Sequence, residues 1–269
     1  MASEAELGEL KERARTGWDR ANYALLAERL MPVARDLVDA CAVSAGQDVL
    51  DVAAGNGNAA AAAAAEGAHV VASDFSPGQV ERGRERTAAE GLDVEWVVAD
   101  VEELPFDDAS FDCVVSVFGA MFGLRPERVA GELFRVLRPG GTAGLASWGS
   151  GGFQNEFFET LRRYRPIMPE GVPPPLLWGQ EDVVRDRLGE LAGSIEFERP
   201  SLRWEFASTQ DMALFFRDAG PRDMEELPEE KVRQLLAELA ELAERYNRAG
   251  DGSLRIDAEY LRVVARKRG

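Results

Sequence analysis

Three aspartates lie at or just beyond the ends of three apolar segments that are predicted to form buried strands. Asp51 lies near the end of the first segment, Asp74 ends the second, and Asp100 follows the third. If the strands are parallel neighbours, their carboxyl ends meet at one edge of the sheet, where open α/β sheets bind ligands. Asp74 can accept hydrogen bonds from both hydroxyls of a ribose, and Asp100 from an exocyclic amine, with Val101 against the base. The spacing predicts an adenosine-type site, and its acidity favours a cationic ligand over a pyrophosphate.

A glycine-containing turn follows Asp51 and leads into an alanine-rich helix that is predicted to begin at about Ala59. The turn reads Ala53-Ala54-Gly55-Asn56-Gly57-Asn58. Small residues let a ligand approach the backbone closely, and amides at the start of a helix favour anionic or strongly polar groups. Counted from Gly55, the turn also fits the dinucleotide fingerprint loosely. A nicotinamide-dependent oxidoreductase and a non-catalytic cofactor-binding protein are therefore alternatives to an enzyme that uses an adenosine-type cofactor.

The elements that must position these groups alternate between strand and helix patterns. Helices are predicted between successive strands, with Gly67 and Gly91 closing the first two. The predicted strands are residues 48–52, 69–74, 94–99, 111–118 and 142–148. This alternation predicts a doubly wound, mostly parallel α/β sheet, and residues 46–148 are interpreted as the cofactor-binding core.

The segments on either side of the core are predicted to cover it. Residues 1–45 are interpreted as an N-terminal helical cap in which Pro32 should kink or divide the second helix. Residues 149–255 are interpreted as a lid and substrate-side elements within the same domain, with helices at about 153–164, 181–190, 209–219 and 229–248 and a strand-like stretch at 195–206. An inert insertion is the alternative to a lid. Residues 256–269 are expected to hold the last strand.

Composition restricts the partners that we expect. The chain has 31 Lys and Arg against 48 Asp and Glu, a formal net charge of −17, and one histidine. Nucleic-acid binding usually requires a basic stripe, so no nucleic-acid partner is expected. No apolar run approaches the roughly 20 residues that span a bilayer, and the acidic start lacks the plan of a signal peptide. We therefore expect a cytoplasmic protein without a membrane partner or a metal, in which Cys41 and Cys113 are buried and reduced.

Several of these segments resemble a known family. The run from Val49 to Gly57 resembles the first motif of class I S-adenosylmethionine-dependent methyltransferases. The segments 99–106, 110–112 and 134–141 resemble the ubiquinone/menaquinone C-methyltransferase-like branch. The resemblance covers about residues 46–148 and departs at Ala53, where the family has its first loop glycine.

The resemblance implies a Rossmann-like methyltransferase fold with seven strands, of which the last, residues 256–266, is antiparallel. It implies S-adenosylmethionine as cofactor, with the turn around its methionine part, Asp74 at the ribose, Asp100 and Val101 at the adenine, and Val117 beside it. The residues expected at the cofactor site are Tyr23, Asp51, Ala53, Gly55, Asn56, Gly57, Asp74, Phe75, Asp100, Val101, Glu102 and Val117.

Aromatic residues outside the core suggest the methyl acceptor. Trp18 and Tyr23 either pack on the core or form a flap over the ligand. An aromatic pocket would suit a small, flat or apolar acceptor, methylated on oxygen or carbon. The residues expected to line it are Trp18, Phe118, Trp148, Phe153 and Trp178.

No obvious general base is found in the sequence. The single histidine, His69, begins the second strand and is therefore at the wrong edge of the sheet. Tyr164 and Glu156 in the lid remain as candidates. Such a base is needed only if the acceptor must lose a proton.

Overall fold

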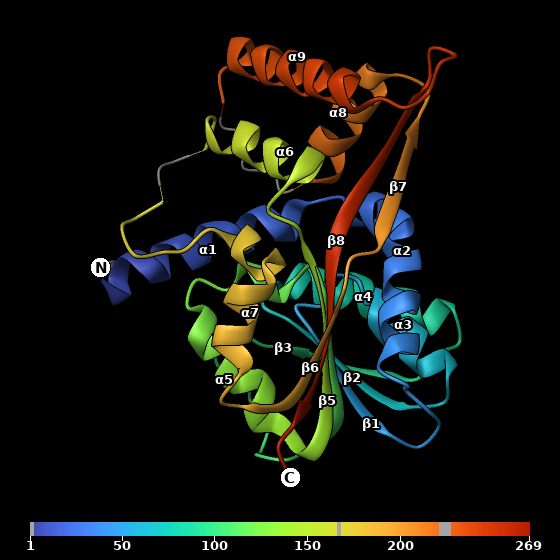
Figure 1. The fold of residues 1–269 in the computed structure, drawn as a ribbon, viewed down its shortest axis with the longest axis vertical. Coiled ribbons are helices and arrows are strands. Elements are labelled where there is room, and N and C mark those ends of the chain that lie inside the picture. Colours follow the sequence, from blue (N-terminus) through green and yellow to red (C-terminus); the bar gives the residue numbers. More distant parts are fainter. Residues whose placement is uncertain (1–2, 166–167, 221–226) are drawn as a thin grey trace.

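The computed structural model describes residues 3–165, 168–220 and 227–269. Its centre is one mixed sheet with helices on both faces. Further helices lie beyond the ends of the strands on one side (Figure 1). The strand order is β3-β2-β1-β4-β5-β8-β6, and β7 pairs with β8 off this path. The strands are β1 (Asp48–Val52), β2 (His69–Asp74), β3 (Val94–Val98), β4 (Phe111–Val117), β5 (Leu137–Trp148), β6 (Ala192–Glu198), β7 (Ser201–Phe206) and β8 (Leu254–Lys267).

The five strands predicted from apolar runs all form and all pair in parallel. Strand β8 is antiparallel to β5, so the predicted doubly wound sheet with an antiparallel last strand is confirmed. The strand-like stretch at 195–206 is in fact two strands, β6 and β7. Strand β8 is long enough to pair with β6 through residues 262–267 and with β7 through residues 254–259.

Helices cover both faces of the sheet. Helices α2 (Tyr23–Ala40) and α3 (Asn58–Ala65) lie on one face, and α5 (Pro126–Val136) and α7 (Glu181–Leu188) lie on the other (Figure 1). The helix α4 (Pro77–Ala89) packs on β2 and β3. Two short 3-10 helices, η1 (Ala120–Phe122) and η2 (Pro175–Gly179), follow β4 and precede α7.

Three helices form a layer beyond the carboxyl ends of the strands, together with β7 and the first half of β8 (Figure 1). They are α6 (Gly152–Arg162), α8 (Thr209–Ala219) and α9 (Glu229–Tyr246). The helices predicted for this part of the chain are thereby confirmed to within a few residues. No helix in the described ranges is long and apolar enough to cross a membrane.

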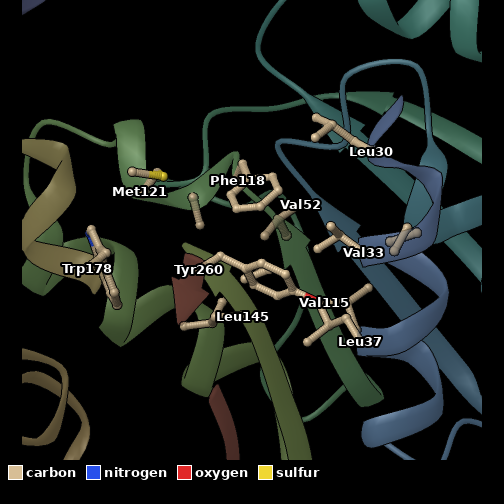
Figure 2. Packing of buried hydrophobic residues seen from close by; sticks show 14 of the residues in the cluster. Leu30, Val33, Leu37, Val52, Val115, Phe118, Met121, Leu145, Trp178 and Tyr260 are labelled. Atoms are coloured by element: carbon tan, nitrogen blue, oxygen red, sulfur yellow. The ribbon is translucent and has the colours of Figure 1, made fainter. Parts of the chain in front are cut away.

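The first two helices precede β1 in the chain. Helix α1 (Glu4–Arg20) lies within the predicted N-terminal helical cap, and a capping box of Ser3 and Glu6 begins it. Helix α2 is continuous through Pro32, so the proline does not divide it, and the alternative of a kink stays a prediction. The side chains of Leu30, Val33 and Leu37 pack against the sheet on both sides of Pro32 (Figure 2). Packing of this apolar face stabilises the helix beyond its local propensity.

The core on the α2 side is closely packed. Cys41 and Cys113 are buried and free, as predicted. A Cβ atom at Gly144 would lie 2.2 Å from Sγ of Cys41, so α2 can approach β5 only because that residue is glycine.

Candidate functional site

Two buried carboxylates hold the glycine turn at the carboxyl ends of β1 and β2. Oδ2 of Asp51 accepts a hydrogen bond of 2.8 Å from the amide of Ala60, in the first turn of α3. Oδ2 of Asp74 accepts one of 2.9 Å from the amide of Gly55, and its Oδ1 accepts one of 2.9 Å from the amide of Ser76. Both side chains are 5% exposed or less. The structure therefore brings Asp51 and Asp74 to the same turn, as the spacing predicted.

Burial changes the acidity of these two groups. Desolvation raises the pKa of Asp51 to about 7, and the nearby Asp74 carboxylate adds to the effect. Desolvation also raises the pKa of Asp74 to about 6, although its two amide hydrogen bonds oppose the rise. A folded-state pKa above the unfolded value means that the folded chain binds more protons. These two groups therefore lower the stability of the fold as the pH rises from about 4 to 7.

Tyr23 lies directly against the glycine turn. A Cβ atom at Gly55, whose φ is +58°, would lie 2.5 Å from Cε1 of Tyr23. Loss of solvent and the nearby carboxylates of Asp74 and Asp51 raise the pKa of the Tyr23 hydroxyl. The ring of Trp18 packs edge-on to that of Tyr23, with centroids 5.7 Å apart. Tyr23 also packs against the buried core, and the flap over a ligand stays a prediction.

The third acid, Asp100, lies in a cavity of about 270 Å³ between α1 and the carboxyl ends of β2 and β3. Phe75 and Ala99 line the sheet side of this cavity, and Lys11 and Arg15 line the helix side. The predicted grouping of the three acids is thus only partly seen: Asp51 and Asp74 are packed under the turn, whereas Asp100 faces the cavity. Pockets for whole small molecules usually exceed about 300 Å³, so this cavity suits one end of a ligand.

Glu102 has contacts that differ from the predicted cofactor role. Its carboxylate accepts hydrogen bonds from the amides of Leu124 and Arg125 and from Nε of Arg125, and it pairs with Lys11 at 2.8 Å. These contacts pin the segment after η1 to the end of β3. Burial acts to raise the pKa of Glu102, but the hydrogen bonds from Lys11 and Arg125 together outweigh it, so the pKa is lowered.

Arg86 of α4 holds the glycine turn through hydrogen bonds to two asparagines, a role that the sequence patterns did not predict. Its Nη1 donates to Oδ1 of Asn58 at 2.7 Å and to Oδ1 of Asn56 at 3.4 Å. Asn58 in turn donates to the carbonyl oxygen of Ala27. Asn56 therefore helps to attach the turn to α4, and its predicted contact with a cofactor stays a prediction.

Two residues beside the turn have left-handed backbone conformations. Ala53 has a φ of +49° and Phe118, just after β4, has a φ of +57°. A Cβ atom at Gly119 would lie 2.2 Å from the carbonyl oxygen of Ala53, so the two loops touch. Strain of this kind clusters at functional sites.

We expect Ala53→Gly to raise the free energy of unfolding by about 1 kcal/mol, because glycine adopts a positive φ without the Cβ penalty. Thermal unfolding of the variant measures this effect. A lower unfolding temperature would show that the methyl group of Ala53 contributes packing that outweighs the strain.

Four of the five aromatic residues expected at the acceptor pocket are buried in packed clusters. Phe118 and Trp148 stack with ring centroids 3.8 Å apart, and Tyr260 meets Phe118 edge-on (Figure 2). Phe153 packs in α6, and Trp178 packs in η2. Their role around an acceptor stays a prediction. Val101 is also buried, and Val117 is partly buried at the end of β4.

The two candidate bases tie α6 and the residues after it to α9. The hydroxyl of Tyr164 donates to Glu238 at 2.6 Å, and that of Tyr246 donates to Glu156 at 2.5 Å. These contacts raise the pKa of Tyr164, mainly through desolvation, and lower that of Glu156. His69 is exposed at the amino edge of the sheet, as predicted. The contacts of Tyr164 and Glu156 therefore lie at interfaces with α9, and the role of either residue as a base stays a prediction.

Comparison with known proteins places this site in context. A family model described as a methyltransferase domain matches residues 49–141, from β1 into β5. The chain is 39% identical over 258 residues to the uncharacterized protein Rv1403c of Mycobacterium tuberculosis, covering 93% of this chain and 92% of that protein.

Two further matches cover the core or the whole fold. A demethylmenaquinone methyltransferase of Clavibacter sepedonicus is 48% identical over 128 residues, which is 47% of this chain and 51% of that protein. The solved structure of a putative methyltransferase from Bacillus halodurans has a TM-score of 0.63 at 22% identity and covers 88% of this chain and 99% of that one.

Proposed function

We propose that this chain, which belongs to the class I S-adenosylmethionine-dependent methyltransferases, transfers the methyl group to a small aromatic or apolar acceptor. The observation that carries the proposal is the pair of buried carboxylates on either side of the glycine turn: Asp74 accepts the amide of Gly55 in the turn, and Asp51 accepts the amide of Ala60 at the start of α3. Membership of this family excludes the alternative of a nicotinamide-dependent oxidoreductase.

The residues present fit the cofactor. At Gly55 the turn has no side chain, and the Tyr23 ring lies in the place that a Cβ atom would need; we call this contact between ring and turn the cradle. Each carboxylate oxygen of Asp74 accepts one amide and keeps a further lone pair for a ribose hydroxyl. The cavity beside Phe75 and Asp100 leaves room for a base. When bound, the cofactor supplies the electrophilic methyl carbon.

The chain's own residues bind and orient in this proposal. The carboxylates near the turn favour a positively charged ligand, and their low exposure strengthens the attraction. Tyr23 and Trp18 cover the turn and exclude water from it. Because an in-line displacement depends on alignment, a turn fixed by Asp51, Asp74 and Arg86 contributes directly to the rate.

The acceptor side rests on α6 and on the ends of β4 and β5. The rings of Phe118 and Trp148 are buried and stack there, and in this proposal they form the apolar side of the acceptor pocket. Gln154 is 4% exposed, and its amide oxygen has no hydrogen-bond partner among the described residues. Buried polar atoms are nearly always paired, so this oxygen is suited to accept from a hydroxyl of the acceptor. This pairing would orient a hydroxyl of the acceptor, whose proton must still leave, to water or to a base, when the oxygen takes the methyl group.

Calorimetry with S-adenosylmethionine and S-adenosylhomocysteine tests the cofactor assignment. We expect both to bind, and absence of binding by either at millimolar concentration would overturn it. Transfer of a labelled methyl group to a panel of phenols, quinols and apolar alcohols then tests the acceptor class. Cofactor binding without transfer to any acceptor, in the panel or in cell extracts, would favour a non-catalytic cofactor-binding protein instead.

We expect the affinity for S-adenosylhomocysteine to rise between about pH 5.5 and 7.5 and then to level off. The pKa values of about 7 for Asp51 and about 6 for Asp74 leave these groups partly protonated below neutrality, whereas ribose hydroxyls and an ammonium group prefer the charged forms. Each required ionisation changes the affinity by up to about tenfold per pH unit below its pKa. Calorimetry across this pH range measures how the affinity changes with pH. The variant Asp51→Asn should no longer show the part of this change that lies near pH 7. A flat profile would contradict the coupling.

A further inference from the structure

The cavity beside Asp100 is closed on one side by α1. The helix is attached near its end, where Oδ1 of Asp19 accepts from the amide of Gly78 at 3.0 Å and the carbonyl oxygen of Trp18 accepts from Gln79 at 2.9 Å. Near its beginning, Glu4 pairs with Arg125 at 2.9 Å. Between these attachments, Gly8, Lys11, Glu12 and Arg15 face the cavity.

Lys11 is shared between two carboxylates. Its Nζ lies 2.5 Å from Oδ2 of Asp100 and 2.8 Å from Oε2 of Glu102. The Asp100 side chain is 33% exposed, whereas that of Glu102 is fully buried. Oδ1 of Asp100 accepts from the amide of Glu102 at 2.9 Å, so Lys11 holds the other oxygen. An amine that approaches Asp100 from the cavity therefore meets an oxygen that already has a cationic partner.

Asp100 and Glu102 differ in the hydrogen-bond donors that each would keep if Lys11 moved away. Glu102 also accepts from Arg125 and from two backbone amides, so it remains a strong and fixed partner. Because Lys11 already contacts Glu102, its ammonium group can leave Asp100 without becoming unpaired. Movement of the ammonium group from Asp100 to Glu102 therefore loses only the interaction energy of the Lys11–Asp100 ion pair. Partly exposed ion pairs of this kind contribute little free energy.

We infer that Lys11 competes with the adenine amine for Asp100, and that cofactor binding displaces its ammonium group from Asp100 onto Glu102. This inference rests on the proposed function, because it takes the cavity as the adenine end of the cofactor site. Lys11 then sets the cofactor affinity by holding the acceptor oxygen until the base arrives.

The test compares Lys11→Met with the unchanged chain by calorimetry, using S-adenosylhomocysteine as ligand. Methionine keeps nearly the length of the side chain and removes its charge. We expect binding to tighten by about two- to fivefold, the range that matches a partly exposed ion pair. Unchanged or weaker binding in a variant with a normal unfolding temperature would overturn the inference.

Two controls separate the possible causes. Glu4→Gln breaks a different ion pair between α1 and the rest of the chain, at a residue that does not line the cavity, so the affinity of this variant should stay unchanged. If it tightened binding equally, loosening of α1 rather than release of Asp100 would be the cause, and the inference would fail. Lys11→Arg keeps the charge and should bind like the unchanged chain.

If Lys11→Met does not fold, the affinity of the unchanged chain for adenosine, measured at several salt concentrations, tests the competition instead. Adenosine is uncharged, so salt acts on the ion pairs beside the cavity rather than on the ligand, and most strongly on the more exposed Lys11–Asp100 pair. The affinity of the unchanged chain for adenosine should rise between about 50 and 500 mM NaCl, because added salt shortens the Debye length and weakens the pair. A constant or falling affinity would count against the competition. Failure of the unchanged chain to bind S-adenosylhomocysteine at all would instead contradict the proposed function.

Discussion

Asp74→Ala should weaken binding of S-adenosylhomocysteine by about 1.5–3 kcal/mol, or roughly 10- to 150-fold, the range for hydrogen bonds to a charged group. The substitution removes the carboxylate at the end of β2 that is proposed to hold the ribose. It also leaves the amides of Gly55 and Ser76 without their acceptor, so the turn itself loses an attachment. Calorimetry at about pH 7.5, where the carboxylate is ionised, measures the change.

Asp112→Asn is the matched control for this effect. Asp112 is also a strand aspartate that accepts a backbone amide, that of Asp48 at 2.9 Å, and it pairs with Arg138 at 2.7 Å. It lies near the start of β4, at the opposite edge of the sheet. Its replacement should lower stability and leave the dissociation constant unchanged. Equal binding by Asp74→Ala and the unchanged chain would refute the ribose role.

Gly55→Ala is expected to lower both the stability of the fold and the affinity for the cofactor. A positive φ costs an alanine about 1–2 kcal/mol. The added methyl group would also lie 2.5 Å from Cε1 of Tyr23, and overpacking of this kind costs about 1–3 kcal/mol more. Because the ring or the turn must move, we expect the affinity for S-adenosylhomocysteine to fall by roughly tenfold or more, given about 1.4 kcal/mol per tenfold change.

Gly140→Ala separates backbone strain from the clash. Gly140 has a φ of +77°, and a Cβ atom added there would meet no other part of the described chain within 4 Å. Its replacement should show the strain alone, with normal binding, in thermal unfolding and calorimetry. A second substitution, Tyr23→Leu, should restore part of the stability of Gly55→Ala. If Gly55→Ala and Gly140→Ala behave alike, the Tyr23 ring moves aside at little cost and does not fix the cradle.

The core of the fold follows from local patterns in the sequence. Parallel strands that are buried on both faces are nearly continuous apolar runs, so β1, β2, β4 and the second half of β5 are visible without knowledge of their neighbours. Strand β3 lies at the end of the strand order and is less buried. The boundary between β6 and β7 was missed because strand-like residues continue on both sides of the break at Arg199 and Pro200. The continuity of α2 through Pro32 depends on packing against the sheet, which no local propensity contains.

The site was predictable to the extent that it depends on strand ends. The positions of Asp51 and Asp74 at one turn follow from parallel pairing of β1 and β2. Lys11 contacts Asp100 across 89 positions of sequence, and Arg86 contacts Asn56 across 30. Contacts over such separations arise from the tertiary arrangement of α1 and α4. The aromatic residues were recognisable as a group, but only packing shows that most of them are buried against one another.

The pairing of β8 has a consequence for how the chain is made. Its three partners, β5, β6 and β7, all precede it in the sequence. While the chain emerges from the ribosome, β5 can complete its pairing with β4 but presents an open apolar edge until β8 covers it. Unpaired edges invite association with other chains. We therefore expect a nascent chain at this stage to be prone to association, and a truncation before Leu254 should accumulate as aggregate.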